Sequence, residues 1–233
     1  MVKIIGISGR KQSGKNTCAN YISGYILKSL GLIYDMNINQ HGELEIKTQD
    51  QTGSIDWGVL SLLRKDNEFS SYAEHGIWPH VKIYHFADYL KKICVDLFDL
   101  EPKQVYGTDV DKNTDTPYNM TAREFLQYLG TDVMRKIKDT VWVDVTIKKI
   151  LEEQSSVAII PDVRFPNEVQ AIHQAGGCVI RLTRDPHRSQ HPCEIALDEE
   201  HYNWSNFDHI INNDSASLET LVNELNKISW RWN

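Results

Sequence analysis

The sequence predicts an α/β fold in which a five-stranded parallel sheet is flanked by helices. Five short apolar runs have the length of buried strands, and helical patterns lie between them. Strands that alternate with helices form parallel sheets with right-handed crossovers. No internal repeat, low-complexity tract or interdomain linker interrupts the 233 residues. We therefore expect one domain over residues 1–233, with ligands at the carboxyl ends of the strands.

The first strand is expected at residues 2–8, and a glycine-rich stretch follows it directly. Residues 9–17 read Gly-Arg-Lys-Gln-Ser-Gly-Lys-Asn-Thr and fit the P-loop pattern Gly-x-x-x-x-Gly-Lys. A strand that enters such a turn and then a helix points backbone N–H groups and the helix dipole at one spot, which holds a polyanion. We expect a P-loop NTPase fold that binds a nucleoside triphosphate together with Mg²⁺. A turn that merely joins a strand to a helix is the alternative. The residues expected to bind the nucleotide are Gly9, Lys11, Ser13, Gly14, Lys15, Asn16 and Thr17.

The order of residues after the P-loop lysine narrows the class of enzyme. Asn16 stands where many P-loop enzymes carry the Ser or Thr that ligates magnesium, and the hydroxyl comes one place later, at Thr17. This Gly-Lys-x-Thr order resembles nucleoside monophosphate kinases more than GTPases or motor ATPases. A kinase for a small molecule is the leading hypothesis.

Composition and charge are those of a soluble globular protein. Hydrophobic residues make up 41% and charged residues 24% of the chain, and the net charge of -7 argues against stable nucleic-acid binding. The four cysteines include no C-x-x-C pair, and His187 and His191 lack a third ligand at metal spacing, so we expect neither a disulfide framework nor a zinc site. The scattered cysteines are interpreted as reduced thiols of a cytoplasmic protein. No run approaches the length of a transmembrane helix and no signal peptide is recognisable, so we expect a soluble protein without membrane partners.

Residues between the P-loop helix and the second strand form a polar insertion. The helix is expected to end at Gly31, and the insertion covers residues 35–80. Within it, residues 43–47 alternate as a short strand or hairpin does. Trp57 and Trp78 are interpreted as packing residues rather than as a platform for a nucleobase.

The second strand (residues 81–87) leads to a helix in which Lys91 lies in the first turn. A lysine at this position opposes the helix dipole, so its placement is locally unfavourable and favours a functional role. A solvated surface lysine is the alternative. Residues 101–118 are rich in turn formers and are expected to form a long mobile loop, either a lid or a connector.

A capping box at residues 121–124 opens the next helix. Arg123 and Gln127 are four residues apart and project from one side of this helix. Asp132 and Arg135 follow, and a surface salt-bridge cluster of Arg123, Asp132 and Arg135 is the alternative to a binding role. A further helix is expected around residues 142–151.

The third strand (residues 157–161) ends at Asp162 and Arg164. An acidic residue at the end of such a strand is where P-loop enzymes place the carboxylate that orients magnesium, so Asp162 is the candidate metal ligand. The fourth strand (residues 178–183) ends at Arg184, which either stabilises charge on a transferring phosphoryl group or pairs with Asp185 and Glu199. Residues 184–200 form a candidate lid. The fifth strand and last helix are expected at residues 207–211 and from residue 218 onward.

Taken in order, these motifs resemble the bacteriophage deoxynucleoside monophosphate kinases over nearly the whole chain. The matched features are the P-loop, Phe-Ala-Asp-Tyr-Leu-Lys (86–91), Arg123 with Gln127, Gly-Thr-Asp (130–132), Pro-Asp-Val-Arg (161–164), Val-Ile-Arg-Leu-Thr-Arg (179–184), and His191 with Glu194. The resemblance implies transfer of the γ-phosphoryl group of ATP to a deoxynucleoside monophosphate, a P-loop kinase fold, a homodimer and, for a phage-encoded chain, the host cytoplasm.

The resemblance also implies roles for residues at matched positions. Lys15 and the P-loop amides would hold ATP, Thr17 and Asp162 would organise Mg²⁺, and Arg164 and Arg184 would act on the phosphates. The residues implied in binding the monophosphate are Lys91, Arg123, Gln127, Asp132, Arg135 and Arg164. Asp88 stands where relatives often have Gly, and residues 35–58 have no matched counterpart, so base preference stays open.

Two other functions stay open at this point. The acceptor could be another small molecule, such as phosphomevalonate, or a hydroxymethylated pyrimidine in DNA. A protein that uses ATP only as a switch would show no dependence on a monophosphate.

Overall fold

A computed structural model describes residues 2–49, 53–64, 66–188, 191–215 and 217–228. The chain divides into two compact units. Residues 1–84 and 150–233 form one, called here the sheet unit, and residues 85–149 form the other, called the helical unit. The expected single domain over residues 1–233 stays a prediction.

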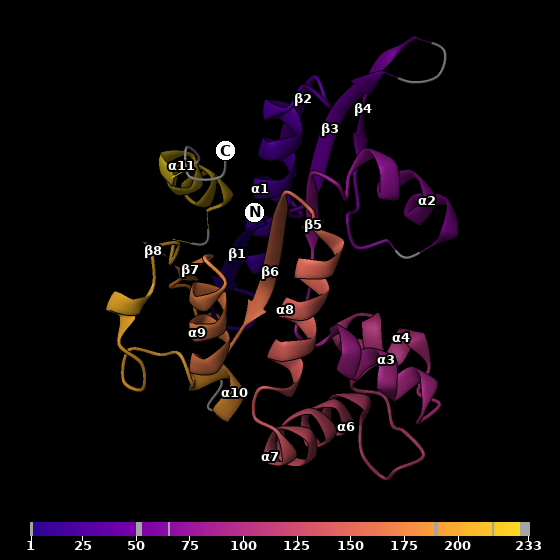
Figure 1. Cartoon of the computed structure of the whole chain (residues 1–233), viewed down its shortest axis with the longest axis vertical. Helices are drawn as coiled ribbons and strands as arrows, with labels where there is room; N and C mark the ends of the chain where they lie inside the picture. The colour runs from indigo at the N-terminus through magenta and orange to yellow at the C-terminus, as the bar shows by residue number, and fades with distance from the viewer. Residues whose placement is uncertain (1, 50–52, 65, 189–190, 216, 229–233) are drawn as a thin grey trace. The chain divides into compact units, whose positions relative to one another are not determined.

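A parallel sheet of five strands is the centre of the sheet unit, as predicted (Figure 1). The strands are β1 (Lys3–Ser8), β5 (Val81–Ile83), β6 (Val157–Val163), β7 (Cys178–Leu182) and β8 (His209–Ile211), in the spatial order β5-β6-β1-β7-β8. Every neighbouring pair is parallel. The central strands are apolar on both faces because helices cover both sides of the sheet.

Helices cover opposite faces of the sheet. Ile5 and Ile7 of β1 share a buried cluster with apolar residues of α1 (Lys15–Ser29) and α11 (Leu218–Ile228). The alternate residues of β1 point the other way. A Cβ atom at Gly6 would lie 2.7 Å from Ile172 of α9 (Pro166–Gln174), which therefore packs closely on the second face. The predicted layering of helices on the sheet is confirmed.

The polar insertion folds as a second, antiparallel sheet, which contains the strand expected at residues 43–47 and two more. Its strands are β2 (Asp35–Ile38), β3 (Leu44–Gln49) and β4 (Ile55–Val59), and α2 (Asn67–Gly76) follows. Leu44 is fully buried and packs so closely on α1 that a Cβ atom at Gly24 would lie 2.5 Å from its Cδ1 atom. Trp78 packs against the core as expected. The packing role predicted for Trp57 is wrong, because β4 lies at the sheet edge and the residue is 45% exposed.

The helical unit contains more helix than the sequence predicts. Its elements are α3 (Asp88–Asp96), α4 (Pro102–Tyr106), α5 (Asp109–Lys112), α6 (Ala122–Gln127), the π-helix η1 (Tyr128–Met134), α7 (Arg135–Ile137) and the first part of α8 (Val141–Glu153). The long loop expected at residues 101–118 is therefore wrong. Thr108 and Asp111 form a capping box that starts α5, with the Thr108 N–H donating to Asp111 Oδ2 at 2.8 Å. Residues that favour turns also favour helix starts, and here they cap helices.

The remaining described elements are α10 (Pro192–Ile195) and the 3₁₀-helix η2 (Trp204–Asn206). The capping box at residues 121–124 and proline in the first turn of α9 are confirmed. All four cysteines are free thiols. None of the helices in the described ranges combines the length and the apolar character needed to cross a membrane.

Candidate active site

The loop between β1 and α1 has the backbone conformation that its glycines were expected to allow. Gly14 is in the left-handed region with φ 102° and is the N-cap residue of α1. Gly9 also has a positive φ, and a Cβ atom there would lie 2.4 Å from Ser13 Oγ. Side chains at these two positions would strain the backbone or collide with the loop. The loop therefore turns tightly enough to present the first amides of α1 to an anion.

A buried hydroxyl in this loop supports the fit to a phosphate ligand. Ser13 is fully buried, and its Oγ atom has no hydrogen-bond partner among the described residues. Its backbone oxygen accepts a hydrogen bond of 2.7 Å from Asn213 Nδ2, which fixes the loop to the segment after β8. A buried polar atom without a partner costs free energy, so a phosphate oxygen beside Ser13 Oγ would be favoured.

Lys15 is the first residue of α1, and its side chain folds back onto the preceding loop. Its Nζ atom donates to Gly9 O at 2.8 Å and to Arg10 O at 2.6 Å. Burial is the main cause that lowers the pKa of Lys15 to about 8, and the Arg164 guanidinium contributes, while the carboxylates of Glu194 and Asp162 act in the opposite direction. Burial disfavours the charged form of this ammonium, and a polyanion beside it would favour that form. The residues present therefore fit the triphosphate of a nucleotide.

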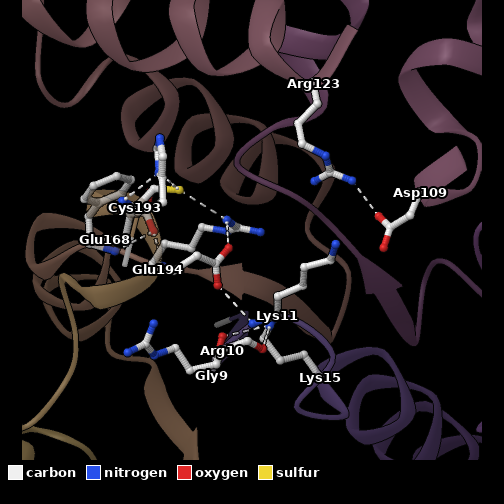
Figure 2. A network of polar contacts seen from close by, with 12 residues as sticks. Gly9, Arg10, Lys11, Lys15, Asp109, Arg123, Glu168, Cys193 and Glu194 are labelled. Atoms are coloured by element: carbon white, nitrogen blue, oxygen red, sulfur yellow. Dashed lines mark hydrogen bonds and ion pairs between the residues drawn. The ribbon is translucent and has the colours of Figure 1, made fainter. Parts of the chain in front are cut away.

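A carboxylate connects the P-loop to Arg164. Glu194 of α10 accepts a hydrogen bond of 2.9 Å from the Lys11 N–H and one of 2.5 Å from Arg164 Nη1 (Figure 2). The main chain at Arg164 is held by Glu168, a buried residue whose Oε2 atom accepts from the Arg164 N–H at 2.6 Å. Sequence reasoning placed Arg164 beside the phosphates but did not assign either carboxylate a role.

A second network joins the P-loop to β7, and sequence reasoning missed it entirely. Asp198 accepts from Arg10 Nη2 at 2.5 Å and from Arg181 Nη2 at 2.9 Å, and Arg181 Nη1 also donates to Ser8 Oγ at 3.0 Å. Arg10 and Arg181 are both buried. The signal was present, since an arginine within the apolar strand Cys178–Leu182 requires a buried partner.

Thr17 and Asp162 are the residues expected to hold Mg²⁺. Asp162 lies within β6, which continues two residues further than expected, to Val163. Its charge acts on the pKa of Lys15, so the carboxylate lies near the P-loop. Thr17 is in the first turn of α1, and its Oγ1 atom faces Gly42 in the turn between β2 and β3, where a Cβ atom would lie 2.3 Å away. Hydroxyl and carboxylate oxygens are ligand types that suit Mg²⁺.

Arg184 follows β7, and its main chain is fixed near the P-loop. The Arg184 N–H donates to Asn213 Oδ1 at 3.1 Å, and the same asparagine holds Ser13. Asp185, one expected partner of Arg184, instead lies 3.6 Å from Arg10 Nε. Asn16 is exposed at the start of α1.

The helical unit holds the residues expected to bind the monophosphate. Arg123 Nη2 donates to Asp109 Oδ1 at 2.6 Å (Figure 2), and Arg123 Nε donates to Asn113 Oδ1 at 3.1 Å. The salt-bridge partner of Arg123 is thus Asp109 rather than Asp132. Lys91 Nζ lies 5.4 Å from the centre of the Tyr106 ring. The helices α6, η1 and α7 follow one another without a break and form one helical segment. This segment carries four of the expected residues, Arg123, Gln127, Asp132 and Arg135.

The Gly-Thr-Asp motif at residues 130–132 lies in the π-helix of this segment. Gly130 is buried, and a Cβ atom there would lie 2.5 Å from Leu90 of α3. The Trp142 Nε1–H donates to Gly130 O at 3.0 Å. Residues of α3 and α8 therefore pack against the π-helix and hydrogen-bond to it. Such helices are frequent at functional sites.

The chain is similar to known proteins. The family model for deoxynucleotide monophosphate kinase matches residues 3–225. A relative in Acanthamoeba polyphaga mimivirus, which carries the name of deoxynucleotide monophosphate kinase, is 36% identical over 129 residues. That alignment covers 48% of this chain and 66%, just under two thirds, of the mimiviral protein. The deoxynucleoside-5'-monophosphate kinase of Escherichia phage T5 is 23% identical over 197 residues, which cover 75% of this chain and 73% of the phage protein. Because the family model spans nearly the whole chain, the chain belongs to the deoxynucleotide monophosphate kinase family.

Proposed function

We propose that this protein transfers the γ-phosphoryl group of ATP to a deoxynucleoside monophosphate, giving the diphosphate and ADP. The proposal is supported by membership of the family and by one observation in the P-loop region. The Glu194 carboxylate accepts hydrogen bonds from the P-loop amide of Lys11 and from the Arg164 guanidinium, and its charge raises the pKa of the Lys15 ammonium, so these three donors surround a position that binds an anion. Amide, ammonium and guanidinium donors are the groups that bind a triphosphate.

The proposed chemistry relies on alignment and charge neutralisation. Lys15 and the loop amides hold the outer phosphates, and Arg164 and Arg184 neutralise charge on the transferring group. Thr17 and Asp162 would hold Mg²⁺, which supplies Lewis-acid polarisation of the phosphates when bound. Little acid–base chemistry is needed, because positioning and electrostatic stabilisation account for most catalysis of phosphoryl transfer.

The acceptor is proposed to bind through the helical unit. Arginine presents a planar fork of donors that matches phosphate, and Arg123 is already oriented by Asp109 and Asn113. Lys91, Gln127, Asp132 and Arg135 complete the proposed set. These five residues would bind the phosphate, sugar or base of the monophosphate.

The experiment measures ADP formation from ATP and Mg²⁺ with each common deoxynucleoside monophosphate, with AMP and without an acceptor. Acceleration by one or more deoxynucleotides is expected, and the pattern gives the base preference. The Lys15→Ala variant should retain its fold by circular dichroism and lose activity by at least about a hundredfold, because it removes a charge used in the transition state. Equal rates with and without every acceptor would refute the proposal and favour an ATP switch or another acceptor.

A homodimer and a place in the host cytoplasm are proposed from the family resemblance alone. Sedimentation equilibrium of the purified chain tests the first. A monomer at assay concentrations would contradict it.

A further inference from the structure

Glu194 contacts the groups that the proposed function assigns to phosphate, and the inference drawn from it rests on that function. Its Oε2 atom accepts from the Lys11 N–H at 2.9 Å and its Oε1 atom accepts from Arg164 Nη1 at 2.5 Å. The side chain is only 11% exposed. Figure 2 shows it directly beside the P-loop, close to the Lys11 main chain.

The two oxygens of this carboxylate therefore use one P-loop amide and one guanidinium at the same time. A phosphoryl group binds to such donors in the same way, through negatively charged oxygens that accept charge-assisted hydrogen bonds. The Lys15 ammonium is also close enough for Glu194 to raise its pKa. A second anion at this position would find both donors, the Lys11 N–H and the Arg164 guanidinium, already bonded to Glu194, and the carboxylate would repel it.

Asp198, four residues later, makes a different kind of contact. Both of its partners are guanidinium groups, those of Arg10 and Arg181, and the Arg181 side chain is 4% exposed. Neither contact involves a P-loop amide. Asp198 thus anchors the segment after α10 to the sheet, whereas the contacts of Glu194 involve donors that a nucleotide would need.

We propose that Glu194 is an internal competitor for the terminal phosphate of the nucleotide. The carboxylate neutralises Arg164 and the Lys11 amide, and ATP must displace it to gain both donors. The Asp198 anchor keeps the displaced segment attached beside the P-loop. Glu194 therefore sets the affinity for ATP, and removing its charge strengthens nucleotide binding.

The test is calorimetric titration of a non-hydrolysable ATP analogue, with Mg²⁺, into three proteins. These are the unmodified chain, Glu194→Gln and the control Glu200→Gln, which removes the same charge from an exposed position in the same segment. Glu194→Gln should bind the analogue about tenfold more tightly, the effect of losing one charge-assisted contact that competes with the ligand. Glu200→Gln should bind within twofold of the unmodified chain.

The outcomes separate this inference from the proposed function. If the unmodified chain binds the analogue and Glu194→Gln binds it equally or more weakly, the competitor role is overturned while the kinase proposal stands. If neither protein binds the analogue, both are overturned. If only Glu194→Gln binds, the competitor role is supported in its strongest form. Should Glu194→Gln fail to fold by thermal melting, Glu194→Asp replaces it, since this variant keeps the charge but shortens the reach to both donors. It should also bind more tightly, and unchanged or weaker binding would overturn the inference.

Discussion

Nucleotide binding should take up a proton near pH 8, because the pKa of Lys15 is lowered from 10.5 to about 8. Burial is the main cause and the Arg164 guanidinium adds to it. A triphosphate beside the ammonium favours its charged form and raises the pKa again. Binding is therefore linked to protonation of Lys15.

The size of this linkage follows from the titration curve. If Lys15 is fully protonated in the complex, uptake is about half a proton per ATP at pH 8, about 0.1 at pH 7 and about 0.9 at pH 9. Above pH 8 the affinity for ATP should fall by about tenfold for each pH unit until the pKa of the bound state is reached. In the free protein, the folded-state pKa lies below the unfolded-state value of 10.5, so protonated Lys15 destabilises the fold and stability should rise as pH increases from about 8 to 10.5.

Calorimetric titration in two buffers of different ionisation enthalpy measures the uptake directly. Lys15→Arg is the matched control, because a guanidinium keeps its charge throughout this range. The control should bind ATP without the uptake seen at pH 8. Uptake below about 0.1 proton at pH 8 in the unmodified chain, or equal uptake in the control, would refute the assigned linkage.

Two further predictions concern residues that position the P-loop. Asp198→Asn leaves Arg181 without its carboxylate partner and Arg10 with the more distant carboxylate of Asp185, so the free energy of unfolding in urea should fall by about 3 kcal/mol. A loss below about 1 kcal/mol would contradict the anchoring role of Asp198. Gly42→Ala places a methyl group against Thr17 Oγ1 and should raise the KM for ATP severalfold, whereas Gly31→Ala, with a similar φ of 70° but nothing within 4 Å, should only lower stability by about 1 kcal/mol. Equal KM values for the two variants would contradict a link between the β2–β3 turn and the nucleotide site.

Features specified by neighbouring residues could be predicted from the sequence. The P-loop, the five strands and the capping box at residues 121–124 each depend on a few consecutive residues, and the structure contains all of them. Residues 101–118 show the limit of such reasoning. Their Asp, Thr and Pro residues favour both turns and helix starts, and only packing within the helical unit decides between the two.

Contacts between distant residues could not be predicted in the same way. Arg10 and Asp198 are separated by 188 positions, and Lys11 and Glu194 by 183. No local pattern relates such pairs. A buried arginine such as Arg181 indicates that a carboxylate is needed but does not identify which one. Thr17 and Asp162 were selected by their place beside the P-loop and the third strand, and their role as metal ligands stays a prediction.

The π-helix at Tyr128–Met134 also has a consequence for how this family could change. A π-turn contains one residue more than an α-turn, so removing one residue there would restore ordinary α-helical spacing. The wider π-turn absorbs the extra residue, so the helix on either side would keep its direction after such a deletion. Residues inside the π-helix, among them Asp132, would instead change the side of the helix from which they project. A deletion of a single codon would thus alter Asp132 and leave Arg135, another proposed acceptor-binding residue, in place.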